Sequence, residues 1–107
     1  MSLQVASVSL EMVAALKPLV ARIKRHDRSL ADQLVRAASS VALNIGEAEY
    51  SDPGNKRARF FTAAGSASET LAAIRVAVAW GYFGKEEGDE AAELAKRVLA
   101  MLWRLTR

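Results

Sequence analysis

Apolar residues recur at spacings of three and four along almost the whole chain, which is the pattern of α-helices with a buried face. Breaks in this pattern divide the chain into four helices, predicted over residues 3–25, 30–49, 53–80 and 85–106. No segment shows the strict alternation of apolar and polar residues that is typical of a half-buried strand. The pattern therefore predicts an all-α protein.

Residues at the ends of these segments act as start and stop signals. Asp52 is a suitable N-cap for the third helix, with Pro53 at its first position. Gly81 is well placed to end the same helix. Ser29 is the expected N-cap of the second helix. Pro18 lies within the first helix and predicts a kink there, because proline lacks the N–H that a helix interior uses.

Short connections make neighbouring helices antiparallel, so the predicted fold is an up-down-up-down antiparallel four-helix bundle. A chain of 107 residues is long enough to bury one core. We therefore expect residues 1–107 to form a single domain.

The apolar stripes of the first and fourth predicted helices are wider than one seam. A helix that is apolar on two faces needs two partners, and a small monomer cannot cover every face. We therefore predict a homo-oligomer that assembles through these two helices. The additional apolar positions are Leu10, Val13, Leu16, Val20, Leu99, Leu102 and Trp103.

Two helix-weakening residues interrupt the apolar stripe of the second helix. Asn44 occupies a seam position, where a polar residue lowers stability but fixes the register of packing. Gly46 lowers helix stability by about 1 kcal/mol relative to alanine, which predicts close packing in this region. The third helix has a small-residue face that includes Gly65 and Ser66.

The second and third helices should form a hairpin that reverses near Asp52, and this predicts which residues lie level. Arg36 lies level with Glu69, and Glu47 lies level with Arg57. Both are pairs of opposite charge. We expect Arg36 and Glu69 to form a semi-buried ion pair, the loss of which on one side would cost about 3–5 kcal/mol.

Composition limits the classes of protein to which the chain can belong. It contains no cysteine, which excludes disulfides and thiolate metal sites. Its longest uncharged stretches are about ten residues, shorter than the ~20 that a membrane helix needs. The start of the chain lacks the basic region of a signal peptide. We therefore expect a soluble, cytoplasmic protein without a membrane partner.

The chain offers few residues for catalysis or metal binding. Its single histidine, His26, lies at a helix end, without the glutamate three positions earlier that a di-metal bundle requires. The acidic run of the fourth helix favours the positive end of the helix dipole, which explains it without any chemistry. We therefore expect no enzymatic activity and no cofactor or metal.

Positive charge is the stronger indication of function. The net charge is +3 and the isoelectric point is about 9.6. Positive charge opposes the dipole at a helix start, so helix stability does not explain the cluster that begins the third helix. Nucleic-acid binding and a solvated face are both possible for these residues. The candidates are Arg22, Lys24, Arg25 and Arg28 at the first corner, and Lys56, Arg57 and Arg59 on the third helix.

Two segments carry a resemblance to a known family. QLVRAASSVALNIGEAE and FFTAAGSASETLAAIRVAVAWGYF resemble the two signatures of the bacterial four-helix bundle protein family. That family is often annotated from proteins encoded in intervening sequences of the large ribosomal RNA gene, and its relatives include the accessory variability determinants of diversity-generating retroelements. The positions in register are Gln33, Arg36, Ala37, Ala38, Asn44, Ile45, Glu47, Gly65, Ser66, Glu69, Gly81 and Tyr82.

The resemblance implies a four-helix bundle that assembles as a ring-like homopentamer and has no enzymatic activity. For the retroelement relatives it implies a basic scaffold that binds nucleic acid and a reverse transcriptase. We therefore expect a homo-oligomeric scaffold or accessory protein that binds structured RNA or DNA through basic helix ends. The alternative is a protein–protein interaction module that binds no nucleic acid.

Overall fold

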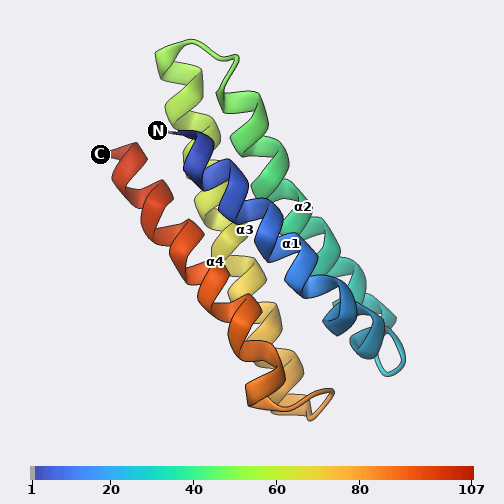
Figure 1. Ribbon diagram of the computed structural model, residues 1–107. Helices are drawn as coiled ribbons and strands as arrows, with labels where there is room; N and C mark the ends of the chain where they lie inside the picture. The colour runs from blue at the N-terminus through green and yellow to red at the C-terminus, as the bar shows by residue number, and fades with distance from the viewer. Residues whose placement is uncertain (1) are drawn as a thin grey trace.

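The computed structural model describes the backbone of residues 2–107 and the side chains of residues 4–107. It contains the four helices α1 (Ser2–Lys24), α2 (Arg28–Ala48), α3 (Pro53–Trp80) and α4 (Lys85–Thr106), and no strand in the part described. Each helix begins and ends within two residues of its predicted bounds. The predicted antiparallel four-helix bundle is confirmed, and it measures 42 × 22 × 19 Å (Figure 1).

The four helices form a closed ring in which consecutive helices pack together and α4 packs back against α1. Thus α2 lies between α1 and α3, and α4 lies between α3 and α1. Both chain ends and the α2–α3 turn lie at one end of the bundle, and the α1–α2 and α3–α4 turns lie at the other (Figure 1). Residues from opposite ends of the sequence therefore meet at one end of the bundle.

The core combines large aliphatic side chains with many alanines. Met12, Leu34, Ile74 and Leu102 are among the largest fully buried side chains, with at least one from every helix. Alanines fill much of the remaining buried surface of α2 and α3, and they allow the helix backbones to approach closely. The buried alanines of these two helices are Ala31, Ala37, Ala38, Ala48, Ala63, Ala64, Ala67, Ala73 and Ala77.

The helix α2 begins earlier than the sequence predicted, and Asp27 rather than Ser29 is its N-cap. One side-chain oxygen of Asp27 accepts a hydrogen bond from the N–H of Leu30 at 3.0 Å. The N–H of Asp27 in turn donates to the carbonyl of Ile23 at 2.8 Å. The connection from α1 is therefore so short that Ser29 already lies inside the first turn of α2.

The other two terminal signals are confirmed. The side chain of Asp52 caps α3 by accepting a hydrogen bond from the N–H of Asn55 at 3.0 Å. This hydrogen bond, followed by one from the Asn55 side chain, lowers the pKa of Asp52 below 3.8. Gly81 ends α3 with a φ of 78°, in the left-handed region that glycine adopts readily. The helix α1 is unbroken through Pro18.

The unusual residues of α2 do not have the roles that their spacing predicted. Asn44 is half-buried at the edge of the seam, and its amide donates within α2 to the carbonyl of Ser40 at 2.9 Å. The buried seam passes through Ile45 instead. An added Cβ at Gly46 or at Gly65 would meet nothing within 4 Å, so neither glycine marks close packing within the chain.

The excess of apolar surface is smaller than the sequence indicated. Leu16 and Leu102 are buried in the core, and Val13, Val20 and Leu99 are half-buried against it. Several large apolar side chains nevertheless remain exposed, and they are spread over all four helices and the α2–α3 turn. These are Leu10, Val35, Leu43, Tyr50, Phe61, Val76, Trp80 and Trp103.

The helix α1 contains a segment, Gln4–Lys24, that is long and apolar enough to cross a membrane by length and composition. The core helix of a soluble protein passes the same test, so this finding is weak evidence of a membrane span. In the bundle, α1 packs against α2 and α4.

Replacing the observed N-cap should destabilise the bundle, and replacing the predicted one should not. We expect Asp27→Ala to lower the free energy of unfolding by about 1 kcal/mol, because a helix N–H loses its acceptor. Ser29→Ala should change it by less than about 0.5 kcal/mol. Urea unfolding at one protein concentration measures both. Equal losses for the two variants would contradict the assignment of Asp27.

Alanine at Gly46 should stabilise the protein, since it favours the helix and meets no neighbour. We expect Gly46→Ala to raise the free energy of unfolding by roughly 0.5–1 kcal/mol. Gly88→Ala is the matched control and should lower it, because the added Cβ would lie 2.9 Å from a ring carbon of Phe83. A loss of stability in Gly46→Ala, measured by thermal unfolding, would show that the surface at Gly46 is not open.

Candidate nucleic-acid interface

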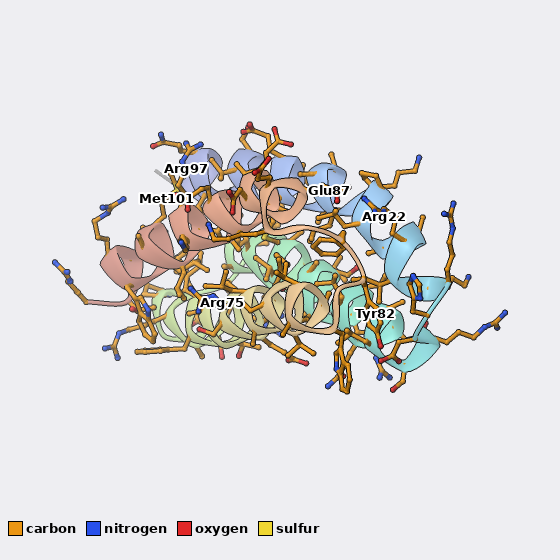
Figure 2. The ribbon with its side chains drawn as sticks, turned by 90° about the horizontal axis from the view of Figure 1, so that it is seen from below. Arg22, Arg75, Tyr82, Glu87, Arg97 and Met101 are labelled. Carbon is orange, nitrogen blue, oxygen red and sulfur yellow. The ribbon has the colours of Figure 1, made fainter. Side chains whose placement is uncertain are left out.

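The two basic clusters lie at opposite ends of the bundle. The first lies at the α1–α2 corner, beside the acidic start of α4. There Arg22 pairs with Glu87, and the two side chains meet between α1 and α4 (Figure 2). Lys24, Arg25 and Arg28 are exposed and form no ion pair with the residues described. This end therefore carries mixed charge rather than a continuous basic surface.

His26 and Tyr82 join the two turns at this same end. Their rings are stacked, with centroids 5.0 Å apart and planes inclined by 3°. The Tyr82 hydroxyl lies 3.5 Å from a side-chain oxygen of Asp27. Partial burial, and then the negative charge of Asp27, raise the pKa of Tyr82 above 10.0. His26 thus takes part in a contact between the α1–α2 and α3–α4 turns, although its side chain is exposed.

The second cluster lies at the start of α3, and its two arginines contact two different helices. Arg59 forms an ion pair with Glu47 of α2, with 3.0 Å between nitrogen and oxygen, and approaches Asn44 at 3.4 Å. Arg57 instead donates from Nε to the backbone carbonyl of Thr106, at the end of α4, at 2.7 Å. Two positions apart on a helix are rotated by about 200°, which sends these arginines to opposite sides of α3.

The ion pair predicted between Arg36 and Glu69 is therefore wrong, and the opposite charges of Glu47 and Arg57, expected to lie level, are not paired either. Glu47 pairs with Arg59 rather than with Arg57. Arg36 and Glu69 are both exposed, and no ion pair joins them. The hairpin rule predicts where a residue lies along the bundle axis. It does not predict on which side of the helix the side chain lies, and the ion pairs depend on that side. The contact that does join the middle of the two helices is a hydrogen bond between the hydroxyls of Ser66 and Ser40, 2.8 Å apart.

The hydrogen bond from Arg57 to the carbonyl of Thr106 explains why a positive charge at the start of α3 is stable. Because α3 and α4 are antiparallel, the first turn of α3 lies beside the last turn of α4. The carbonyls of that last turn form the negative end of the α4 dipole, and a guanidinium there is stabilising. The positive charge that opposes the dipole of its own helix therefore complements the dipole of the next one.

Four cations at this end form what we call the basic end: Lys56, Arg57, Arg104 and Arg107. Lys56 is half-buried, the three arginines are exposed, and none forms an ion pair with a described residue. The nearby acidic residues belong to α2 and the α2–α3 turn, whereas those of α4 lie in its first half. This end of the bundle therefore has positive charge without acidic neighbours on α4, and Arg104 borders a hollow that Gln4 and Val5 of α1 also line.

Two half-exposed aromatic rings lie beside the basic end. Phe61 of α3 and Trp103 of α4 are 42% and 46% exposed. Their rings meet edge to face, with centroids 5.9 Å apart and planes inclined by 70°. The guanidinium carbon of Arg57 lies 5.0 Å from the centroid of Phe61, a cation–π distance. We call these two rings the aromatic platform.

Sequence reasoning placed Lys56 and Arg57 in a candidate site but did not include Trp103. The missing step is the register of the α3–α4 hairpin. A reversal near Tyr82 would place Arg57 level with Arg107, by the rule already applied to the α2–α3 hairpin. Trp103 then follows, because it lies one turn before Arg107 on α4.

Two hollows lie on other parts of the surface. One of about 520 Å³ lies between α3 and α4, bordered by Arg75 and Lys96 among others. The second, of about 270 Å³, lies between α1 and α2 and is lined mostly by apolar residues, including Leu34 and Val35. Among the residues that the structure describes, no three histidine or acidic side chains gather as metal ligands would.

Comparison with known proteins identifies the family. Residues 1–104, nearly the whole chain, match the family described as 23S rRNA-intervening sequence protein. The chain belongs to this family. The resemblance seen in the two sequence signatures is thereby confirmed.

A solved structure supports the fold that this family membership implies. The crystal structure of a protein of unknown function from the S23 ribosomal protein family of Bacteroides thetaiotaomicron is similar, with a TM-score of 0.89. The match covers 96% of this chain and 98% of that one, at 19% sequence identity, and therefore concerns the fold alone. No curated protein matches this member of the 23S rRNA-intervening sequence protein family.

The structural role of Arg57 can be tested by comparison with its neighbour. We expect Arg57→Gln to lower the free energy of unfolding by about 1 kcal/mol, because the last turn of α4 loses a charged hydrogen-bond donor. Lys56→Gln removes the same charge and should change stability by less than about 0.5 kcal/mol. Chemical unfolding followed by circular dichroism measures both. Indistinguishable variants would contradict a specific role for the contact with Thr106.

Proposed function

We propose that the protein is a non-enzymatic, homo-oligomeric scaffold or accessory protein that binds the phosphates of structured RNA or DNA through its basic end. The observation that carries this proposal is that Lys56, Arg57, Arg104 and Arg107 lie at one end of the bundle, where the start of α3 meets the end of α4, and none forms an ion pair with a described residue. Cations that are not neutralised by carboxylates are free to replace the counterions of a nucleic acid.

The basic end is favoured over the α1–α2 corner as the binding surface. At the corner, Arg22 is neutralised by Glu87, and further carboxylates of α4 lie at the same end. A phosphate backbone would meet those carboxylates as well as the arginines. At the basic end, the nearest ion pair, between Arg59 and Glu47, faces α2 and leaves the α3–α4 side open.

Self-association would strengthen the proposed binding, because repeated copies would multiply a modest charge. One chain carries a net charge of +3, and each further copy adds the same amount. The exposed apolar side chains of α1 and α2 offer surface for such contacts, among them Leu10 and Leu43. A ring of five copies, as the family resemblance implies, would present five basic ends.

The family description is consistent with a nucleic-acid context, since it refers to a sequence within 23S rRNA. The chemistry of the side chains favours binding over catalysis. The only histidine, His26, is stacked on Tyr82, and among the described residues no acidic cluster accompanies it. We therefore propose that the protein holds a partner in place and does not transform it.

The second candidate function is a protein–protein interaction module, for which a reverse transcriptase is one possible partner. The observation that favours it is the hollow between α1 and α2, which is bordered by Val13, Val20 and Val35 and is almost wholly apolar. Such a surface suits an apolar side chain of another protein. Lys17 is the single charged residue in its lining.

Removing charge at the basic end should weaken nucleic-acid binding more than removing it elsewhere. We expect Arg104→Gln with Arg107→Gln to lower affinity for an RNA hairpin and a DNA duplex by about tenfold at low salt. The slope of log affinity against log salt should become less steep by about 2, because two phosphate contacts per chain are lost. Fluorescence anisotropy with labelled nucleic acid over a salt series measures both quantities.

The matched control is Lys24→Gln with Arg25→Gln, which removes the same charge at the other end of the bundle. It should leave the slope unchanged. Equal effects of the two double variants would contradict a localised binding surface. Absence of binding by the unmodified protein at low salt would contradict nucleic-acid binding altogether and would favour the interaction module.

A further inference from the structure

The aromatic platform is unusual because two large rings remain half-exposed while held in a fixed arrangement. Nε of Arg57 donates to the carbonyl of Thr106 at 2.7 Å, and the hydroxyl of Thr106 donates to the carbonyl of Trp103 at 3.0 Å. Thr106 itself is buried. These contacts tie the start of α3 to the last turn of α4, so the relative position of Phe61 and Trp103 is set by the fold.

The surface beside the platform is open. Gly65 follows Phe61 by one turn on α3, and an added Cβ there would meet nothing within 4 Å. Arg107, four residues after Trp103, directly follows α4 and is exposed. The rings therefore have a bare helix surface on one side and positive charge on the other.

A separate hollow lies between the same two helices, farther along the bundle. Phe61 and Trp103 touch across these two helices near the basic end. Towards the other end, the same pair of helices borders the hollow that contains Arg75 and Lys96. Lys96 is paired with Glu93, whereas Arg75 forms no ion pair with the residues described. Asp89 and Glu93 also line this hollow, so its charge is mixed and Arg75 is its one cation without an ion pair among the described residues.

Proteins that bind single-stranded nucleic acids combine exposed aromatic rings with nearby cations such as arginines. The bases of these nucleic acids are free to stack on aromatic side chains, while the phosphates contact cations. Bases inside a duplex are already stacked on one another and are not accessible in this way. A polyanion also explains why the flanking cations have no acidic partners on α4.

We propose that an unpaired base of single-stranded RNA or DNA stacks on the aromatic platform while the adjoining phosphates contact the basic end. This inference rests on the proposed function, because it names which form of nucleic acid the same site selects. A structured nucleic acid with an unpaired loop or a single-stranded end would fit both the proposed function and this inference. Phe61 and Trp103 then determine specificity for unpaired nucleotides, and the arginines supply affinity.

Tryptophan fluorescence can report the stacking directly. The chain has two tryptophans, so Trp80→Phe leaves Trp103 as the single reporter. We expect a single-stranded oligonucleotide of about 12 nucleotides to quench Trp103, a length within the range that such surfaces bind. A blunt-ended duplex of the same sequence should bind through phosphates without quenching it. Quenching of equal size by both nucleic acids would overturn the inference.

Affinity measurements on variants provide the second test. Trp103→Leu should lower affinity for the single strand about tenfold, because one stacked base is lost, and leave duplex affinity unchanged. Tyr50→Leu is the matched control, since Tyr50 is a 93% exposed aromatic residue at the same end but lies in the α2–α3 turn. It should change neither affinity. Circular dichroism verifies that both variants remain helical.

The outcomes separate this inference from the proposed function. Unchanged single-strand affinity in Trp103→Leu, with binding retained, would overturn stacking and leave phosphate binding in place. If the protein bound neither the single strand nor the duplex, both the stacking inference and the proposed function would be overturned. A change in the mass of the assembly in Trp103→Leu, measured by analytical ultracentrifugation, would assign the platform to contacts between copies and would also overturn stacking.

Discussion

The closed ring of helices is the constraint on which the rest of the structure depends. Each helix has to present a packing surface to two neighbours, so its buried arc is wide and must be partly composed of small residues. In α3 this role falls to alanines such as Ala64 and Ala67. This arrangement of the four helices also fixes which helix ends are adjacent. It places the start of α3 beside the end of α4, and the contact between Arg57 and Thr106 follows from that adjacency.

Much of the fold could be predicted because its signals are local. The bounds of α3 and α4 follow from residues at their own ends, such as Asp52 and Gly81, whose conformational preferences act within one turn. The N-cap of α2 was misassigned since Asp27 and Ser29 are both good caps. The choice between them depends on how tightly the chain leaves α1. That is set by the packing of the two helices and not by the residues of the turn.

The candidate site could be predicted only in part. Charge counting located the cluster at the start of α3, but it could not tell that Arg57 and Arg59 face different helices. Asn44 was placed in the seam because its spacing allowed it, yet Ile45 is the residue that is buried. Spacing defines a stripe to within about one residue, or 100° of rotation. The partners of a side chain depend on that rotation, and the partnership of Phe61 with Trp103 depends also on the register between two helices.

The acidic and basic side chains of α4 are segregated along its axis, so they contribute a dipole moment to the molecule. Its first half carries Glu86, Glu87 and Glu90, and its last turn carries Arg104, with Arg107 following it. The bundle is 42 Å long and about half as wide, so these charges are well separated along one axis. In the field of a polyanion the bundle would experience a torque that turns the basic end forward before contact. Such pre-alignment raises the rate of productive encounters, and added salt weakens it by screening.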